Sequence, residues 1–139
     1  MLNFLTSMET KSLTEIVRSL KHITFNHKYD LIVGIARGGM VPAYLVSNML
    51  DVPLELMWMN FRNDQHQPQR DKPTLLKSLQ FNPRDKKILL VDDRANSGQT
   101  LAVARSLLKQ ATVIESLVIN GQADYNLFDQ VCFTLPWDI

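Results

Sequence analysis

Residues 88–91, Ile-Leu-Leu-Val, form an apolar run that ends directly in two acids, Asp92 and Asp93. A short continuous apolar run is typical of a strand that is buried on both faces of a parallel sheet. Small polar residues follow, and then apolar residues recur at helical spacing, which predicts a turn and a helix at 98–111. This strand–turn–helix unit places two carboxylates at the carboxyl end of a strand, where parallel α/β sheets bind their ligands.

The turn after the acids has the composition of an anion site. Helix N-termini present unpaired backbone N–H groups and partial positive charge, and Ser97, Gly98 and Thr100 suit a phosphate there. Ionised carboxylates accept hydrogen bonds from sugar hydroxyls or bind a hard cation such as Mg2+. The alternative is that Asp93 or Asn96 only caps the helix.

A second unit of the same kind lies upstream. Residues 31–35 read as a buried strand and residues 41–50 as a helix, joined by Ala36-Arg37-Gly38-Gly39. Glycines let backbone amides approach a ligand, and the Arg37 guanidinium suits phosphate oxygens. An ordinary glycine turn with a solvent-facing arginine is the alternative.

Together these two units resemble the signatures of the type I phosphoribosyltransferases. In that family the turn after the acid pair holds the 5-phosphate of phosphoribosyl pyrophosphate (PRPP), and the acid pair contacts its ribose. The upstream turn, which contains Arg37 here, holds pyrophosphate. The resemblance implies a Mg2+ cofactor and makes Asp92, Asp93 and Asn96 the expected catalytic residues. It also implies a 5-phosphate site formed by Ala95, Asn96, Ser97, Gly98, Gln99 and Thr100. The implied pyrophosphate site is formed by Arg37, Gly38 and Gly39.

The run Lys-Lys-Ile-Leu-Leu-Val-Asp-Asp also resembles the first strand of a phosphorylation receiver domain. Such a domain needs a phospho-acceptor aspartate at the end of a later apolar strand. None of the later acids has that setting, so the receiver interpretation is disfavoured; they are Glu115, Asp124, Asp129 and Asp138.

The tail from Gly121 onward resembles the xanthine–guanine branch of the family. That resemblance implies that Asp138, in Pro-Trp-Asp, helps Asp92 and Asp93 to hold Mg2+, and that Phe133 stacks on the nucleobase. Packing of Phe133 in the core is an equal alternative, and the adjacent Cys132 is a weaker candidate for the stacking position. Gln122 stands where a base-reading lysine is usual.

Two departures bear on the acceptor. Asn96 replaces an aspartate thought to handle a purine proton, and an amide cannot exchange a proton at neutral pH. Gln122 offers a hydrogen bond without charge. The expected function is transfer of the phosphoribosyl group from PRPP to a nucleobase, most simply a purine. The alternative is a catalytically weak PRPP- or nucleotide-binding regulator.

Residues 60–82 interrupt the pattern with a polar segment. The resemblance implies a flexible hood that closes over PRPP, in which Arg62, Arg70 and Lys72 neutralise pyrophosphate. An ordinary exposed loop is the alternative.

Composition sets the remaining expectations. A chain of 139 residues is expected to form a single domain, 1–139, and a net charge of +1 argues against nucleic-acid or membrane partners, including an RNA-binding module. One cysteine and the absence of a leader pattern or long apolar run predict a cytoplasmic location. The family resemblance implies a homodimer or homotetramer.

Alternating elements predict an α/β fold of three layers: a mostly parallel twisted sheet flanked by helices. A capping box at Ser12–Glu15 should start the first helix. The expected strands are 31–35, 54–59, 88–91, 113–120 and 131–134.

Overall fold

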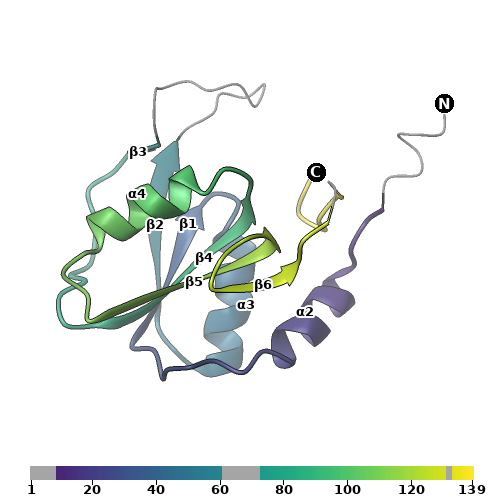
Figure 1. Ribbon diagram of the computed structural model, residues 1–139, viewed down its shortest axis with the longest axis horizontal. Coiled ribbons are helices and arrows are strands. Elements are labelled where there is room, and N and C mark those ends of the chain that lie inside the picture. Colours follow the sequence, from purple (N-terminus) through teal and green to yellow (C-terminus); the bar gives the residue numbers. More distant parts are fainter. Residues whose placement is uncertain (1–8, 61–72, 131–132) are drawn as a thin grey trace.

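The computed structural model describes residues 9–60, 73–130 and 133–139 (Figure 1). A six-stranded sheet forms the middle layer. Its strands are β1 (Leu31–Ala36), β2 (Leu54–Asn60), β3 (Thr74–Leu75), β4 (Lys87–Ala95), β5 (Val113–Gly121) and β6 (Tyr125–Phe128). The helices are α2 (Leu13–Lys21), α3 (Met40–Leu50) and α4 (Gln99–Leu107).

The order of the strands is β3-β2-β1-β4-β5-β6, and all neighbours run parallel except β2 and β3. Helices α2 and α3 pack on one face and α4 on the other (Figure 1). Each face of the sheet has its own hydrophobic core, and side chains of β4 point alternately into the two. Leu89 and Val91 pack in the core under α2 and α3, and Ile88 and Leu90 pack in the core under α4. The predicted three-layer, mostly parallel α/β fold is confirmed.

Burial on both faces explains why the two diagnostic runs are apolar throughout. All six residues of β1 are buried, and in β4 the four residues from Ile88 to Val91 have no exposed surface. The first helix begins as expected: Ser12 Oγ accepts a hydrogen bond from the backbone N–H of Glu15, and Glu15 Oε1 accepts one from that of Ser12. None of the helices in the described ranges is long and apolar enough to cross a bilayer.

The edges of the sheet differ from the expectation. The last strand is β6, and the predicted strand at 131–134 is wrong in its described part, where Thr134 makes only an isolated bridge to Thr10. Residues 131 and 132 lie outside the described residues. Helix α4 ends at Leu107 rather than at 111, because the chain turns back so that the Thr112 N–H bonds the Lys86 carbonyl.

The connections diverge between β1 and β4. From β1 the chain crosses through α3 to β2 on one side, whereas from β4 it crosses through α4 to β5 on the other. A crevice opens at such a switch point beyond the carboxyl ends of the strands, and this is the usual ligand site of open α/β sheets. Both turns singled out by the sequence follow these two strands.

Close packing of α3 on β1 depends on Gly34. A Cβ added there would lie 2.7 Å from the Ala43 Cβ. We therefore expect Gly34→Ala to lower the free energy of unfolding by about 1–3 kcal/mol, as overpacking does.

The swap Gly34→Ala/Ala43→Gly should lose less stability than the sum of the two single changes, because it removes the methyl group that collides. Chemical denaturation of all four proteins measures this coupling. Strict additivity of the two changes would contradict the proposed contact.

Candidate functional site

The Arg37 turn is in direct contact with the end of β4. A Cβ on Gly38 would lie 2.6 Å from both carboxylate oxygens of Asp93, and one on Gly39 would lie 2.5 Å from the Val91 carbonyl oxygen. Only residues without a side chain allow this approach. The glycines of the Arg37 turn therefore pack against the end of β4 and bring the two motifs into one site.

The two acids differ in their surroundings. Asp92 is 8% exposed, and its Oδ1 accepts a hydrogen bond of 2.8 Å from the Asp93 N–H. Burial, and then the neighbouring Asp93 charge, raise the pKa of Asp92 well above its ordinary value. The Asp93 side chain is 17% exposed. Asp93 is thus the more accessible of the two carboxylates, and Asp92 is the more deeply buried.

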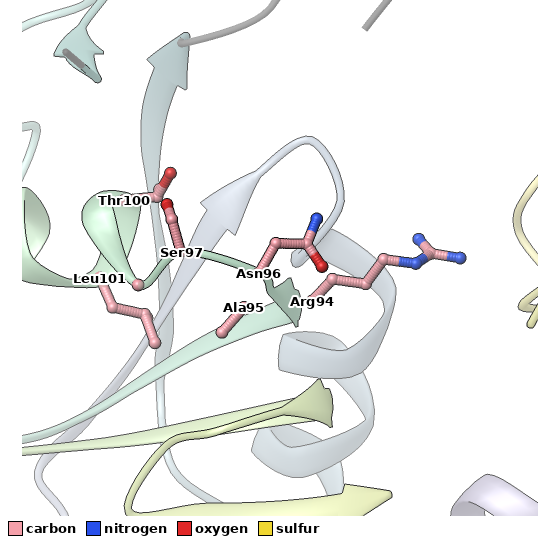
Figure 2. A pocket seen from close by; sticks show the side chains of 7 residues that line it. Arg94, Ala95, Asn96, Ser97, Thr100 and Leu101 are labelled. Carbon is pink, nitrogen blue, oxygen red and sulfur yellow. The ribbon is translucent and has the colours of Figure 1, made fainter. Parts of the chain in front are cut away.

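Residues after the acids form a hollow at the start of α4. In Figure 2 the Ser97 and Thr100 hydroxyls point to the same side, while Arg94 extends away from the turn. Gly98, with φ of 79°, begins α4 and supplies no side-chain cap, so neither Asp93 nor Asn96 caps this helix. The hollow is lined by Arg94, Ala95, Asn96, Ser97, Gly98, Thr100 and Leu101.

This hollow can hold an anion. The helix start carries partial positive charge, and the Ser97 and Thr100 hydroxyls can donate to phosphate oxygens. The Gln99 N–H already has a local partner, Ser97 Oγ, at 3.3 Å. A phosphate that takes over such a weak local bond gains a stronger, charge-assisted one.

Two cationic side chains lie over the ring of Trp58 on β2. Arg37 is exposed, and its guanidinium carbon lies 5.9 Å from the centre of the Trp58 ring on β2. The Lys77 Nζ lies over the same ring at 4.4 Å. Sequence reasoning missed Lys77, because it follows the short strand β3, which shows no clear alternation.

Arg94 is the most connected side chain of the site. Its Nη1 donates to Asp93 Oδ2 at 3.1 Å, and its Nη2 donates to Asp138 Oδ2 at 2.5 Å and to the Phe133 carbonyl at 3.2 Å. Sequence reasoning did not include Arg94 among the expected site residues. Its positive charge, at a position between the acid pair and the predicted phosphate turn, was the signal that could have identified it.

Gln122 follows the end of β5 and is exposed. Its Nε2 donates to a carboxylate oxygen of Asp129. The preceding Gly121 has φ of 121°, and a Cβ there would lie 2.3 Å from the Ala95 carbonyl oxygen. Gln122 therefore lies just beyond β5, the neighbour of β4 on the side of the sheet that holds β6.

The structure places Phe133 elsewhere than the stacking prediction requires. Its side chain is 2% exposed and packs edge-on against Phe128, with ring centres 5.5 Å apart. Lys11 Nζ lies 5.4 Å from the same ring. Phe133 is a core residue in this arrangement, which corrects the interpretation of its ring as a surface for the nucleobase.

The predicted metal set of Asp92, Asp93 and Asp138 is not assembled. Within the described ranges, no three carboxylate, histidine or cysteine side chains come together as metal ligands. Arg94 lies between Asp93 and Asp138 instead. The hood residues Arg62, Arg70 and Lys72 lie outside the described residues.

Comparison with known proteins agrees with this geometry. The model of the phosphoribosyl transferase domain family matches residues 9–134. The chain belongs to this family.

Among curated relatives, xanthine-guanine phosphoribosyltransferase of Chromohalobacter salexigens is 32% identical over 88% of this chain and 77% of its own length. The enzyme of the same name from Cereibacter sphaeroides is 36% identical over 62% of this chain; that match spans about half, 52%, of the relative. Purine phosphoribosyltransferase from Pyrococcus horikoshii has the same fold, with a TM-score of 0.79, 25% identity and coverage of 94% and 93% of the two chains.

Burial of Asp92 predicts a pH-dependent effect of Asp92→Asn on stability. An aspartate in the unfolded chain loses its proton near pH 4, whereas folded Asp92 holds its proton to higher pH. Ionisation therefore costs the wild type stability as the pH rises above about 4. The asparagine avoids this cost, so the variant should gain stability relative to the wild type as the pH rises.

Denaturation from pH 3.5 to pH 7 measures the difference. Asp85→Asn is the control, because it makes the same chemical change at a side chain that is 85% exposed and not buried. A constant loss of stability in Asp92→Asn across the range would contradict the raised pKa.

Proposed function

We propose that this protein transfers the 5-phosphoribosyl group of PRPP to a nucleobase, most simply a purine, and releases pyrophosphate. One observation carries the proposal: at the switch point of the sheet, Gly38 of the Arg37 turn lies against the carboxylate of Asp93, which stands 55 residues later at the end of β4. A single ligand with a phosphate at one end and a pyrophosphate at the other would span both turns.

Each part of PRPP has a matching group. The 5-phosphate lies on the N–H groups and hydroxyls of residues 95–100. The Asp93 carboxylate accepts hydrogen bonds from the ribose hydroxyls. The buried Asp92 holds the Asp93 backbone by accepting a hydrogen bond from its N–H. Pyrophosphate lies against the backbone of Gly38 and Gly39, with the Arg37 guanidinium on its oxygens.

Catalysis follows from charge. The bond between ribose and pyrophosphate breaks as a nitrogen of the base attacks, so negative charge grows on the leaving group and positive charge on the sugar ring. Arg37 and the backbone donors stabilise the first, and the Asp93 carboxylate stabilises the second. These groups are already in place before the reaction, so they need little reorganisation as charge develops. This preorganisation is the source of their effect.

Members of the family generally take Mg2+ together with PRPP. The described residues fit such an ion only as one carried by the donor: Mg2+ on phosphates needs one or two carboxylates at most, and Asp93 can supply one. An ion held by Asp92, Asp93 and Asp138 together does not fit, because Arg94 occupies the oxygens of the last two.

Two amides favour a second candidate function. Asn96 and Gln122 replace groups that would exchange a proton with a purine and read its oxygen by charge. Each can still form hydrogen bonds to a base. A protein that binds PRPP or a nucleotide with little turnover is the alternative that these residues support.

Asp93→Ala should abolish turnover of PRPP, and Asp93→Asn should reduce it by at least about 10²-fold, because the amide keeps the shape but loses the charge that favours the cationic sugar. Release of pyrophosphate measures both. Circular dichroism and denaturation check that the variants fold. Turnover by Asp93→Ala at the wild-type rate would remove the acid pair from the mechanism.

A panel of bases decides between the two functions. The wild type is assayed with guanine, xanthine, hypoxanthine, adenine, uracil and orotate. Saturable PRPP binding without turnover of any base would favour the regulator.

Asn96→Asp is the matched gain-of-function variant. It should raise turnover with a 6-oxopurine by about 10²-fold or more, the usual scale of general acid–base catalysis. The pH profile of the variant should show a new ionisation. No gain would mean that Asn96 is not what limits the wild type. A cytoplasmic location and a homodimer or homotetramer remain predictions of the sequence.

A further inference from the structure

A positive group already lies between two of the expected metal ligands. The guanidinium of Arg94 donates through Nη1 to Asp93 and through Nη2 to Asp138, at 3.1 Å and 2.5 Å. The backbone N–H of Arg94 donates to the other oxygen of Asp93 at 2.7 Å. Each carboxylate therefore has a cation beside it before any ion arrives.

Both oxygens of Asp138 already have hydrogen-bond partners. Its Oδ2 accepts a second hydrogen bond, of 2.8 Å, from the backbone N–H of Leu135, and its Oδ1 lies 3.5 Å from Arg94 Nη1. The Asp138 N–H in turn donates to the Leu135 carbonyl at 2.9 Å. A divalent ion of the size of Mg2+ needs bare oxygens at about 2.1 Å in octahedral array, and it would have to displace the guanidinium to reach them.

Arg94 is held on three sides. The Phe133 carbonyl accepts from its Nη2 at 3.2 Å, and Phe133 is itself buried in the core. The Arg94 side chain is only 27% exposed. Partial burial strengthens these charge-assisted bonds, and the planar fork of arginine suits several acceptors at once. The guanidinium is thus a fixed part of the site rather than a mobile surface charge.

We propose that Arg94 is a built-in cation that takes the place of a protein-held metal ion between Asp93 and Asp138. It positions the Asp93 carboxylate against Gly38 and fastens the tract 133–138 to the end of β4. The donor complex then contains one divalent ion, the one that pyrophosphate carries. The number of divalent ions in the donor complex rests on the proposed function, whereas the role of Arg94 between the two carboxylates does not.

Manganese binding tests the role of Arg94 without any donor. Free and bound Mn2+ are measured by electron paramagnetic resonance for the wild type, Arg94→Gln, Arg94→Lys and the double variant Arg94→Gln/Asp138→Asn. Arg94→Gln removes the cation and frees both carboxylates, so it should bind one Mn2+ at least about tenfold more tightly than the wild type. Arg94→Lys keeps the charge and should not.

The double variant should return to the weak binding of the wild type, because it has lost one of the two carboxylates. A residue with a merely structural role would not raise the affinity for Mn2+ when it is removed. Equal Mn2+ affinity in the wild type and Arg94→Gln, with both proteins folded by circular dichroism, would overturn the proposal.

Titration of the wild type with PRPP present needs no variant. One Mn2+ per bound PRPP supports the proposal, and two would overturn it even if Arg94→Gln does not fold. Absence of PRPP binding would count against the proposed function instead, and the measurements without donor would still judge Arg94.

Discussion

The site depends on the contact between a turn without side chains and the end of β4. Gly38 and Gly39 lie so close to the Asp93 carboxylate and the Val91 carbonyl that a methyl group on either would collide. This contact is possible because β1 and β4 are parallel neighbours in register, with Gly34 paired to Val91. The strands are apolar because helices cover both of their faces. Burial thus fixes the strands, the strands bring their carboxyl ends together, and the glycines close the gap.

The same contact determines how charge is arranged. Asp92 is buried beneath it, where an ionised carboxylate is costly, while Asp93 reaches the crevice and is balanced by Arg94. Asp93 pairs with the Arg94 guanidinium at the place where the proposed cationic sugar would form.

Much of the fold could be predicted, because local patterns decide it. Continuous apolar runs indicated β1 and β4, and a capping box indicated the start of α2. The edges of the sheet could not be predicted in this way. Strand β3 has two residues, and β6 has four that are only partly buried, so neither shows the periodicity of a core strand. Phe133 was open to two interpretations, because an aromatic residue before a loop can pack inward or face a ligand, and only tertiary contacts decide between them.

The same difference separates the proposed donor side of the site from the proposed acceptor side. The groups proposed to hold phosphate and ribose lie within one strand–turn–helix unit, between Asp92 and Thr100. The acceptor side is assembled from the ends of β5 and β6 and from the tract 133–138, which are joined to the turn by long-range contacts such as those of Arg94. A single side chain there can decide which residues become neighbours. Arg94 binds Asp138 and the backbone carbonyl of Phe133, and so holds both close to Asp93. The family follows from the local motif, whereas the choice of base depends on contacts that a motif does not contain.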